Sequence, residues 1–289
     1  MISRIKHRLA ICAAGIFLGL TGVSQGADVV APNAFPTIQG DTGNLLPILS
    51  PQPIRYQQVY DHSQFAAFAA GGEYITQIAF RVHSPGIAFS ASIGSLQVNL
   101  STTPKVPEAL SATFSDNIGT DDTVVFPAAQ VDFSTSVAGP ADGPQAFDLV
   151  ITFATPFHYD PSKGNLLLDI RNSSGATHDP ANDQEIDATS TGGDGVSRVY
   201  NLGDVAAVTA GQTGGGFQMD TFGAVTRFVS TPTSPAVTPP HTLLNSAAFP
   251  FPALAQQSSA RRHFATGIGS SARSAIARNH ILRMMSLPG

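Results

Sequence analysis

About ten short runs of β-type residues, separated by turn residues, constrain this chain more than any other feature. The runs are rich in Val, Ile, Phe, Tyr and Thr, and Gly, Pro, Asn and Asp stand between them. This spacing is typical of a β-sandwich or barrel, and the lack of alternating helical patterns excludes βαβ folds. The predicted strands are residues 55–60, 73–83, 95–101, 123–126, 130–134, 146–154, 165–171, 184–189, 197–202 and 222–229.

Residues 155–172 are the clearest local pattern. An apolar run at 146–154 precedes them, the cluster Asp-Pro-Ser-Lys-Gly occupies 160–164, and a dense apolar run follows at 165–171. Two β-type runs joined by such turn residues indicate a hairpin. We therefore expect strands 146–154 and 165–171 to pair in one antiparallel sheet.

Alternation in the strand at 73–83 predicts which of its faces is buried. Tyr74, Ile78 and Phe80 share one face with Thr76 and Val82. The opposite face, which includes Glu73 and Arg81, is mostly polar and is expected to face solvent. In the strand at 95–101, residues Leu96, Val98 and Leu100 are expected to point inward.

Residues 1–27 have the pattern of a secretory signal peptide. Three basic residues lie within the first eight, an apolar run extends from about residue 9 to 23, and small residues follow. We expect cleavage after Gly26 or Ala27. The alternative, a membrane anchor, needs about 20 apolar residues, more than this run contains. The only cysteine, Cys12, lies in this segment, so the mature chain cannot form an internal disulfide.

Prolines mark the segments on either side of the predicted strands. Residues 28–53 contain five prolines, which predicts an extended lead-in that cannot pair continuously in a sheet. Residues 230–240 are rich in Pro, Ser and Thr and read as a linker. The basic tail up to residue 289 is expected to be largely disordered, with a short helix near 272–285 and a membrane or partner contact as alternatives. The β domain is therefore expected at 54–229.

The charges are divided unevenly along the chain. Residues 28–229 hold only 7 of the 15 Lys and Arg residues but all 20 acids, which gives this segment a net charge of −13. Nucleic-acid binding needs clustered Lys and Arg on the surface. An acidic body of this kind argues against nucleic acid as a partner.

The loop at 115–122 is the candidate metal site. It carries Asp116, Asn117, Asp121 and Asp122, and carboxylate and amide oxygens are the ligands that Ca²⁺ takes. The spacing differs from that of an EF-hand, and Asp, Asn and Gly are also ordinary turn residues, so turn formation stays an alternative to calcium. A second polar loop at 178–185, followed by Asp187, allows the same two interpretations.

No catalytic motif emerges from the sequence. His62, His83, His158 and His178 form no paired metal-ligand motif. The one Gly-x-Ser-x-Gly match, at residues 22–26, lies in the predicted signal peptide and not at a strand-to-helix elbow. Two strand carboxylates, Asp148 and Asp169, could serve glycoside hydrolysis only at a suitable separation in space. We therefore predict neither a catalytic residue nor an enzymatic activity, and no cofactor beyond the candidate Ca²⁺.

Several blocks in order resemble a family of secreted bacterial jelly-roll-like proteins that carry a PEP-CTERM sorting signal. The first is Arg-Tyr-Gln-Gln-Val-Tyr at 55–60, with Ser-Gln-Phe at 63–65. The other blocks are residues 75–81, 97–103, 113–126, 155–172 and 195–200. The resemblance implies an exported protein of the cell envelope or exopolysaccharide matrix, and it brings no catalytic residues. The family's ending, a Val-Pro-Glu-Pro-type motif with an apolar helix and clustered arginines, does not follow residue 228.

These observations together predict an all-β, antiparallel jelly-roll-like sandwich between a signal peptide and a disordered tail. The expected role is that of an exported extracellular or cell-surface protein that acts by interaction, with extracellular polysaccharide or envelope components as partners and without a stable transmembrane anchor in the mature chain. The alternative is a carbohydrate-binding or carbohydrate-active sandwich.

Overall fold

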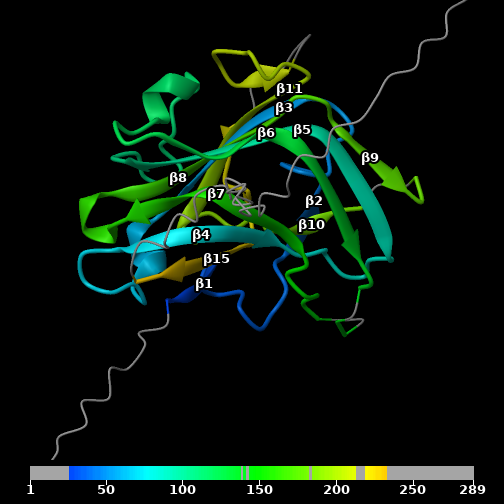
Figure 1. Ribbon diagram of the computed structural model, residues 1–289, viewed down its shortest axis with the longest axis horizontal. Helices are drawn as coiled ribbons and strands as arrows, with labels where there is room; N and C mark the ends of the chain where they lie inside the picture. The colour runs from blue at the N-terminus through cyan, green and yellow to red at the C-terminus, as the bar shows by residue number, and fades with distance from the viewer. Residues whose placement is uncertain (1–25, 138, 141–142, 182–183, 213–218, 233–289) are drawn as a thin grey trace, which may run out of the picture. The chain divides into compact units, whose positions relative to one another are not determined.

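The protein is all-β, and its strands form several mainly antiparallel sheets (Figure 1). The computed structural model describes residues 26–137, 139–140, 143–181, 184–212 and 219–232. The predicted signal peptide up to residue 25, and the predicted linker and tail from residue 233 onward, lie outside the described residues. No helix in the described part of the chain has the length and apolar character needed to cross a membrane.

The largest sheet has the strand order β12-β11-β3-β8-β5-β6, with β9 paired to β5 and β13 to β11. Its pairs are antiparallel except for β11 with β12. The bounds are Ile54–Tyr60 for β3, Phe89–Thr103 for β5, Thr123–Thr135 for β6, Asn165–Asn172 for β8, Ala176–Asp179 for β9, Val196–Leu202 for β11, Gly211–Gln212 for β12 and Met219–Asp220 for β13.

The second sheet has four strands in the order β1-β15-β4-β7, all antiparallel. The bounds are Asp28–Ala31 for β1, Glu73–Phe80 for β4, Leu149–Tyr159 for β7 and Thr226–Thr231 for β15. A third, small sheet joins β2 (Thr42–Asn44), β10 (Ile186–Thr189) and β14 (Gly223–Ala224). The described residues also contain three short 3-10 turns: η1 (His62–Phe65), η2 (Phe114–Asn117) and η3 (Pro161–Lys163).

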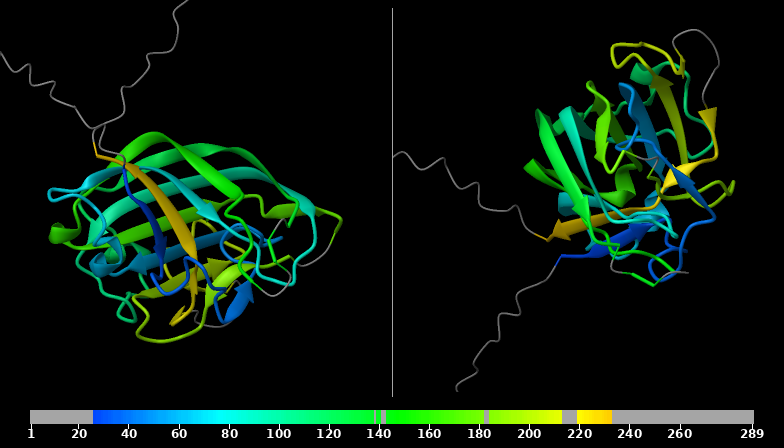
Figure 2. Two further views of the ribbon diagram at one scale, coloured as in Figure 1. Left: turned by 90° about the horizontal axis from the view of Figure 1, so that it is seen from below. Right: turned by 90° about the vertical axis from the view of Figure 1, so that its right-hand side faces the viewer.

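The main core lies between the two large sheets, which Figure 2 shows as facing layers. Leu96, Val98 and Leu100 on β5 point into it, as the sequence predicts. Aromatic side chains close one end of the core: Phe65 of η1 makes edge-to-face contacts with Tyr159 and Phe228, with ring centroids 5.0 and 5.2 Å apart. Such contacts add stability beyond the area they bury.

The centre of the large sheet is also covered on its outer face. Val59 of β3, Leu167 of β8 and Val199 of β11 pack there against Leu110 and Phe114 from the segment after β5. Because both faces of β3, β8 and β11 are covered, these strands have almost no exposed residues. Of the three, β8 has the apolar run that is typical of such a strand, whereas β3 and β11 also bury polar side chains that form hydrogen bonds within the protein.

The predicted hairpin between residues 146–154 and 165–171 is wrong. Strand β7 pairs with β4 in the four-stranded sheet, whereas β8 pairs with β3 and β5 in the large sheet. The turn at 160–164 thus carries the chain from one layer to the other. The burial patterns explain the error, since β7 alternates buried and exposed residues and β8 is buried throughout, and strands of one hairpin would share their environments.

The predicted faces of the strand at 73–83 are wrong in part. Ile78, Phe80 and Val82 are buried in the main core as predicted, but Tyr74 and Thr76 are only half-buried. A bulge between Ile75 and Gln77 shifts the register against β7, so Ile75 joins Ile78 and Phe80 in the core. A bulge inserts one extra residue and reverses the alternation beyond it. Glu73 and Arg81, expected in solvent, are both buried.

The lead-in belongs to the β domain, which begins before the expected boundary at residue 54. As predicted, it does not pair continuously: β1 pairs with β15, and β2 pairs with β10. Val29, Ile48 and Leu49 from this segment are buried in the main core. At the other end, β15 extends to Thr231, two residues beyond the expected limit of 229.

A buried ion pair holds the lead-in and the small sheet against the four-stranded sheet. Arg81, 1% exposed, lies 2.7 Å from the Asp187 carboxylate, which is fully buried. The Arg81 guanidinium also donates to the carbonyls of Phe35 and Ile38 at 2.9 and 2.6 Å. Asp187 accepts from the Gly40 amide at 2.9 Å, so both charged groups are satisfied.

We predict that Asp187→Asn destabilises the protein by about 3–5 kcal/mol, because it leaves the Arg81 charge buried without an anion. Denaturant unfolding of the full chain, followed by circular dichroism, measures this change. Arg227→Ala is the control: it breaks a largely exposed ion pair with Asp28 and should cost less than about 1 kcal/mol. Equal losses in the two variants would contradict the central role of Arg81 and Asp187.

Candidate functional site

Two hollows share the residue Glu108, and together we call them the Glu108 cleft. The first has a volume of ≈ 190 Å³. The second has a volume of ≈ 440 Å³. The first is lined by Glu108, Leu110, Ser197, Arg198, Asp220 and Thr221. The second is lined by Asp61, Ser63, Gln64, Val106, Pro107, Glu108, Gly193, Asp194 and Gly195.

Glu108 is held in an unusual backbone conformation. Its φ angle is 64°, in the left-handed region that residues other than glycine rarely adopt. Its amide donates to the Ser197 hydroxyl at 2.6 Å, and its carboxylate accepts from the Gly193 amide. These contacts join the segment after β5 to β11 and to the loop before β11. Non-glycine residues in this region often mark functional positions.

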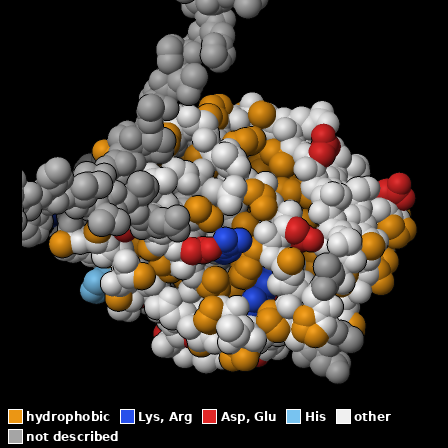
Figure 3. Space-filling view, turned by 60° about the horizontal axis from the view of Figure 1, so that its bottom comes forward, with side chains coloured by type: hydrophobic (Ala, Val, Ile, Leu, Met, Phe, Trp, Pro, Cys, Tyr) orange, Lys and Arg blue, Asp and Glu red, His pale blue; other side chains and the backbone are white. Residues whose placement is uncertain are grey.

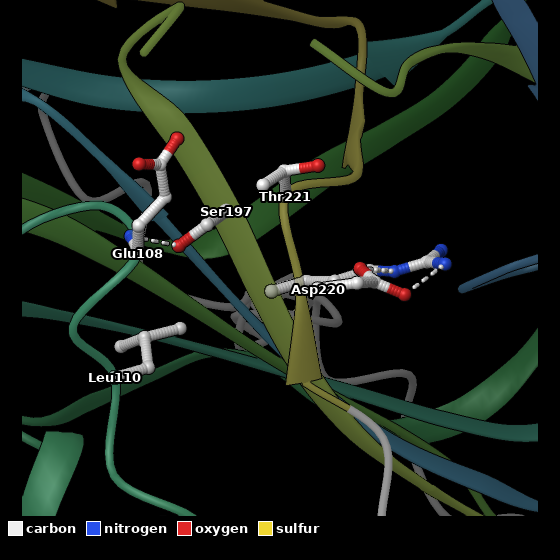
Figure 4. Close-up of a pocket in the computed structure, with 6 residues that line it drawn as sticks. Glu108, Leu110, Ser197, Asp220 and Thr221 are labelled. Carbon is white, nitrogen blue, oxygen red and sulfur yellow. Dashed lines mark hydrogen bonds and ion pairs between the residues drawn. The ribbon is translucent and has the colours of Figure 1, made fainter. Parts of the chain in front are cut away.

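Arg198 and Asp220 both line the first hollow and form an ion pair there. The Arg198 Nε and a terminal nitrogen donate to the two Asp220 oxygens at 2.7 and 2.9 Å. Its guanidinium also lies over the rings of Tyr200 and Phe222, 4.9 and 4.7 Å from their centroids. Figure 4 shows the Asp220 carboxylate turned toward this guanidinium, away from Glu108. The one cation that lines the first hollow is thus neutralised, and Glu108 adds negative charge beside it.

Two carboxylates in the second hollow have opposite pKa shifts. Burial raises the pKa of Asp194 above its ordinary value, and the charges of Asp41 and Glu108 add to this against hydrogen bonds from Thr189 and Val196. For Asp61, burial also acts to raise the pKa, but hydrogen bonds from Ser63 outweigh it, so its pKa is lowered. The raised pKa of Asp194 and the lowered pKa of Asp61 mean that, as the pH falls, Asp194 takes up a proton before Asp61 does.

The four candidate calcium ligands have different hydrogen-bond partners in the structure. Asn117 is fully buried under the outer face of the large sheet, where its amide donates to the Gln57 side chain at 3.0 Å and to the Ser111 carbonyl at 2.9 Å. Gln57 in turn donates to Asp169 at 3.0 Å. Asn117 therefore fastens the covering segment to β3.

The three aspartates of this loop each have a different partner. Asp116 accepts from the Ser111 hydroxyl at 2.9 Å, and Asp121 accepts from the Thr102 amide at 2.7 Å. Asp122 accepts from the Asn99 amide at 3.0 Å. Among the residues that the structure describes, no group of three or more His, Cys, Asp or Glu side chains is placed to hold a metal ion. Calcium at this loop stays a prediction without a described ligand cluster.

Asp187, which follows the second polar loop, is not placed as a ligand for a metal ion. Asp187 is neutralised by Arg81, and His83 lies 3.2 Å from its other oxygen. Of the suggested glycosidase pair, Asp169 is bound by Arg55 at 2.9 Å in the large sheet. Asp148 precedes β7 in the other sheet, where burial raises its pKa. The structure does not bring these two acids together.

The Glu108 cleft was missed in the sequence because its residues share no spacing. Glu108 lies between β5 and η2, Ser197 and Arg198 lie on β11, and Asp220 ends β13. A left-handed φ angle at a glutamate leaves no mark in a single sequence. The block Gly-Val-Ser-Arg-Val-Tyr at 195–200 carries part of the family resemblance, but its sequence does not mark a site.

One face of the domain shows how its charged side chains are distributed. Figure 3 shows the side of the domain on which β4, β15 and β1 lie. Charged side chains are scattered there among hydrophobic and uncharged ones, and the basic groups in view do not form a broad patch.

Comparison of the chain with protein-family models, with curated proteins and with solved structures finds no match. What can be inferred about its function therefore rests on its own residues and their geometry.

We predict that Asp194→Asn stabilises the protein at neutral pH. A carboxyl with a raised pKa in the folded state contributes most below its unfolded pKa of about 4, and this contribution is lost as the pH rises through the folded pKa. The advantage of the variant, measured as a difference in melting temperature, should therefore shrink as the pH falls toward 4.

Asp61→Asn is the matched control in the same hollow. Because the folded pKa of Asp61 is lowered, its contribution is present above the unfolded pKa and is lost as the pH falls through the folded value. This variant should be less stable than the parent at neutral pH and equal to it in acid. The same sign of pH dependence in both variants would contradict the assignment.

Proposed function

We propose that this protein is exported and acts by binding, and that the Glu108 cleft holds a segment of an extracellular polysaccharide. The single observation that carries this proposal is Glu108 itself, fixed in a left-handed conformation between two hollows. A residue held there by Ser197 and Gly193 presents its carboxylate without any rearrangement. Preorganised groups lose less entropy when a ligand binds.

The lining of the cleft is suited to hydroxyl groups of neutral sugars. Glu108 and Asp194 offer acceptors, while Ser63, Gln64 and Ser197 can donate or accept. The net negative charge of the lining disfavours anionic chains, since a like charge would be desolvated beside Glu108. A neutral or cationic polysaccharide therefore fits this cleft better than an acidic one.

The case for export rests on the sequence. Residues 1–27 have the charge and hydropathy pattern of a signal peptide. The resemblance to PEP-CTERM-associated proteins points to the cell envelope or the extracellular matrix as the destination. We further propose that the strand order is a variant of the jelly roll, which is supported by two facing, mainly antiparallel sheets joined by crossovers such as the one from β7 to β8.

A carbohydrate-active enzyme is the alternative, because Glu108 and Asp220 line the same hollow. Glycoside hydrolysis uses two carboxyl groups on opposite sides of one bond. In Figure 4 the two carboxylates point in different directions, and that of Asp220 is bound by Arg198. This geometry favours binding over hydrolysis.

We predict that the full chain is retarded in native gels that contain a neutral β-glucan and migrates freely in gels that contain alginate. Glu108→Gln keeps the size and one oxygen of the side chain but removes its charge. Because hydrogen bonds to charged groups contribute about 1.5–3 kcal/mol, the apparent Kd should rise at least about tenfold. Glu185→Gln, an exposed acid outside the cleft, is the control and should bind as the parent does. Equal binding by both variants would exclude the cleft.

Export is predicted to place the chain outside the cytoplasm. When it is expressed with residues 1–27 in a bacterium, immunoblots of medium, envelope and cytoplasm should detect it mainly in the first two fractions. A chain that lacks residues 1–26 is the control and should stay in the cytoplasm. Retention of the complete chain in the cytoplasm would overturn the proposal of export.

A further inference from the structure

Glu73 is a buried carboxylate surrounded by neutral donors. It is 4% exposed, and its oxygens accept from the Ala27 amide at 3.0 Å, the Ala69 amide at 3.1 Å and the Ser230 hydroxyl at 2.5 Å. Among the described residues, no Lys, Arg or His side chain forms an ion pair with it. A buried carboxylate is normally paired with a cation or strongly hydrogen-bonded.

Ala27 is fixed in place at both of its backbone groups. Its carbonyl accepts from the Ser230 amide at 3.0 Å, and the Ser230 Oγ, whose single proton goes to Glu73, lies 2.9 Å from the same carbonyl oxygen. Its nitrogen is thereby directed at Glu73. The first described strand and the last one, β1 and β15, meet at this point, as Figure 2 shows. The position of the Ala27 nitrogen is thus set by the fold and not by the residues before it.

The residues that precede Ala27 have the features of a peptidase site. Signal peptidases accept small residues at the last and third-last positions before the cut. Ser24 and Gly26 occupy these positions for a cut before Ala27, whereas a cut before Asp28 places Gln25 at the third-last position. A Cβ atom on Gly26 would lie 1.8 Å from the Ser230 carbonyl oxygen, so a larger residue there would clash with β15.

We propose that the signal peptide is removed by hydrolysis of the Gly26–Ala27 bond and that the new α-amino group of Ala27 becomes the cationic partner of Glu73. The C–N bond breaks, water supplies hydroxyl to the Gly26 carboxyl and hydrogen to the Ala27 nitrogen, and the amine takes up a proton from solvent. With an ordinary pKa near 8, this amine is an ammonium at neutral pH. The inference rests on the proposed export, since a signal peptidase acts only on exported chains.

The electrostatics of Glu73 are prepared for this partner. Burial acts to raise the pKa of Glu73, but hydrogen bonds from the Ala27 amide, the Ser230 hydroxyl and the Ala69 amide outweigh it, so its pKa lies below the ordinary value. The carboxylate is therefore ionised when the new ammonium forms. Cleavage one residue later would remove Ala27. Glu73 would then lose the Ala27 amide as a donor, and the Ser230 amide would lose the Ala27 carbonyl as its acceptor.

N-terminal sequencing of the exported protein is the first test, with the complete chain expressed in a bacterium. The inference requires Ala27 as the first residue. An exported chain that begins at Asp28 or elsewhere overturns the inference and leaves the proposed export intact. An uncut chain retained in the cytoplasm overturns both the proposed export and this inference.

Thermal unfolding tests the ion pair. Residues 27–289 are prepared with a free and with an acetylated α-amino group. Acetylation removes the charge and should lower the Tm by at least about 2 °C at pH 6–7. An ammonium beside a carboxylate has a raised pKa, so the difference is full below its unfolded pKa near 8 and is lost as the pH rises through the folded value. A pH-independent difference would overturn the ion pair.

Glu73→Gln, combined with acetylation, tests whether Glu73 is the partner of the α-amino group. In this background acetylation should change the Tm little, whereas in the Glu185→Gln background it should act as it does in the parent. An equal effect of acetylation in all backgrounds would show that Glu73 is not the partner. Because the pH dependence is measured on the parent chain, the inference remains testable even if Glu73→Gln does not fold.

Discussion

The ion pair between Arg81 and Asp187 is the interaction on which the arrangement of this domain most depends. It joins the end of β4 to β10, and through the carbonyls of Phe35 and Ile38 and the amide of Gly40 it also fixes the lead-in. A charge buried to this degree is tolerated only when its counter-charge and hydrogen bonds are all present. The pair therefore favours one packing of the lead-in over others of similar apolar content.

The second constraint is the burial of the large sheet on both faces. The main core covers its inner face, and the segments that carry Leu110, Phe114 and Ala210 cover its outer face. Polar groups in these covers, above all Asn117, must find partners within the protein, and the contacts with Gln57 and Ser111 provide them. The same covering segment contributes Glu108 and Leu110 to the lining of the Glu108 cleft, so the candidate binding site is part of the outer layer of the fold.

The sequence predicted strand positions better than strand partners. The all-β class was expected and is confirmed, as is the inward face of Leu96, Val98 and Leu100. The hairpin across residues 160–164 was wrong because turn residues show where the chain reverses but not which sheet it enters next. The contrast between the alternating pattern of β7 and the continuous burial of β8 was the signal that could have separated them.

The sequence by itself determined the class of fold, the turns and the acidic character of the β segment, because local propensity and composition are properties of neighbouring residues. Only the tertiary structure decided that Arg81 and Glu73 lie inside, that the Asn117 side chain is bonded to Gln57, and that Glu108 lies between two hollows. Each of these depends on contacts between residues far apart in the chain. A bulge of one residue in β4 was enough to reverse the predicted faces of the residues that precede it.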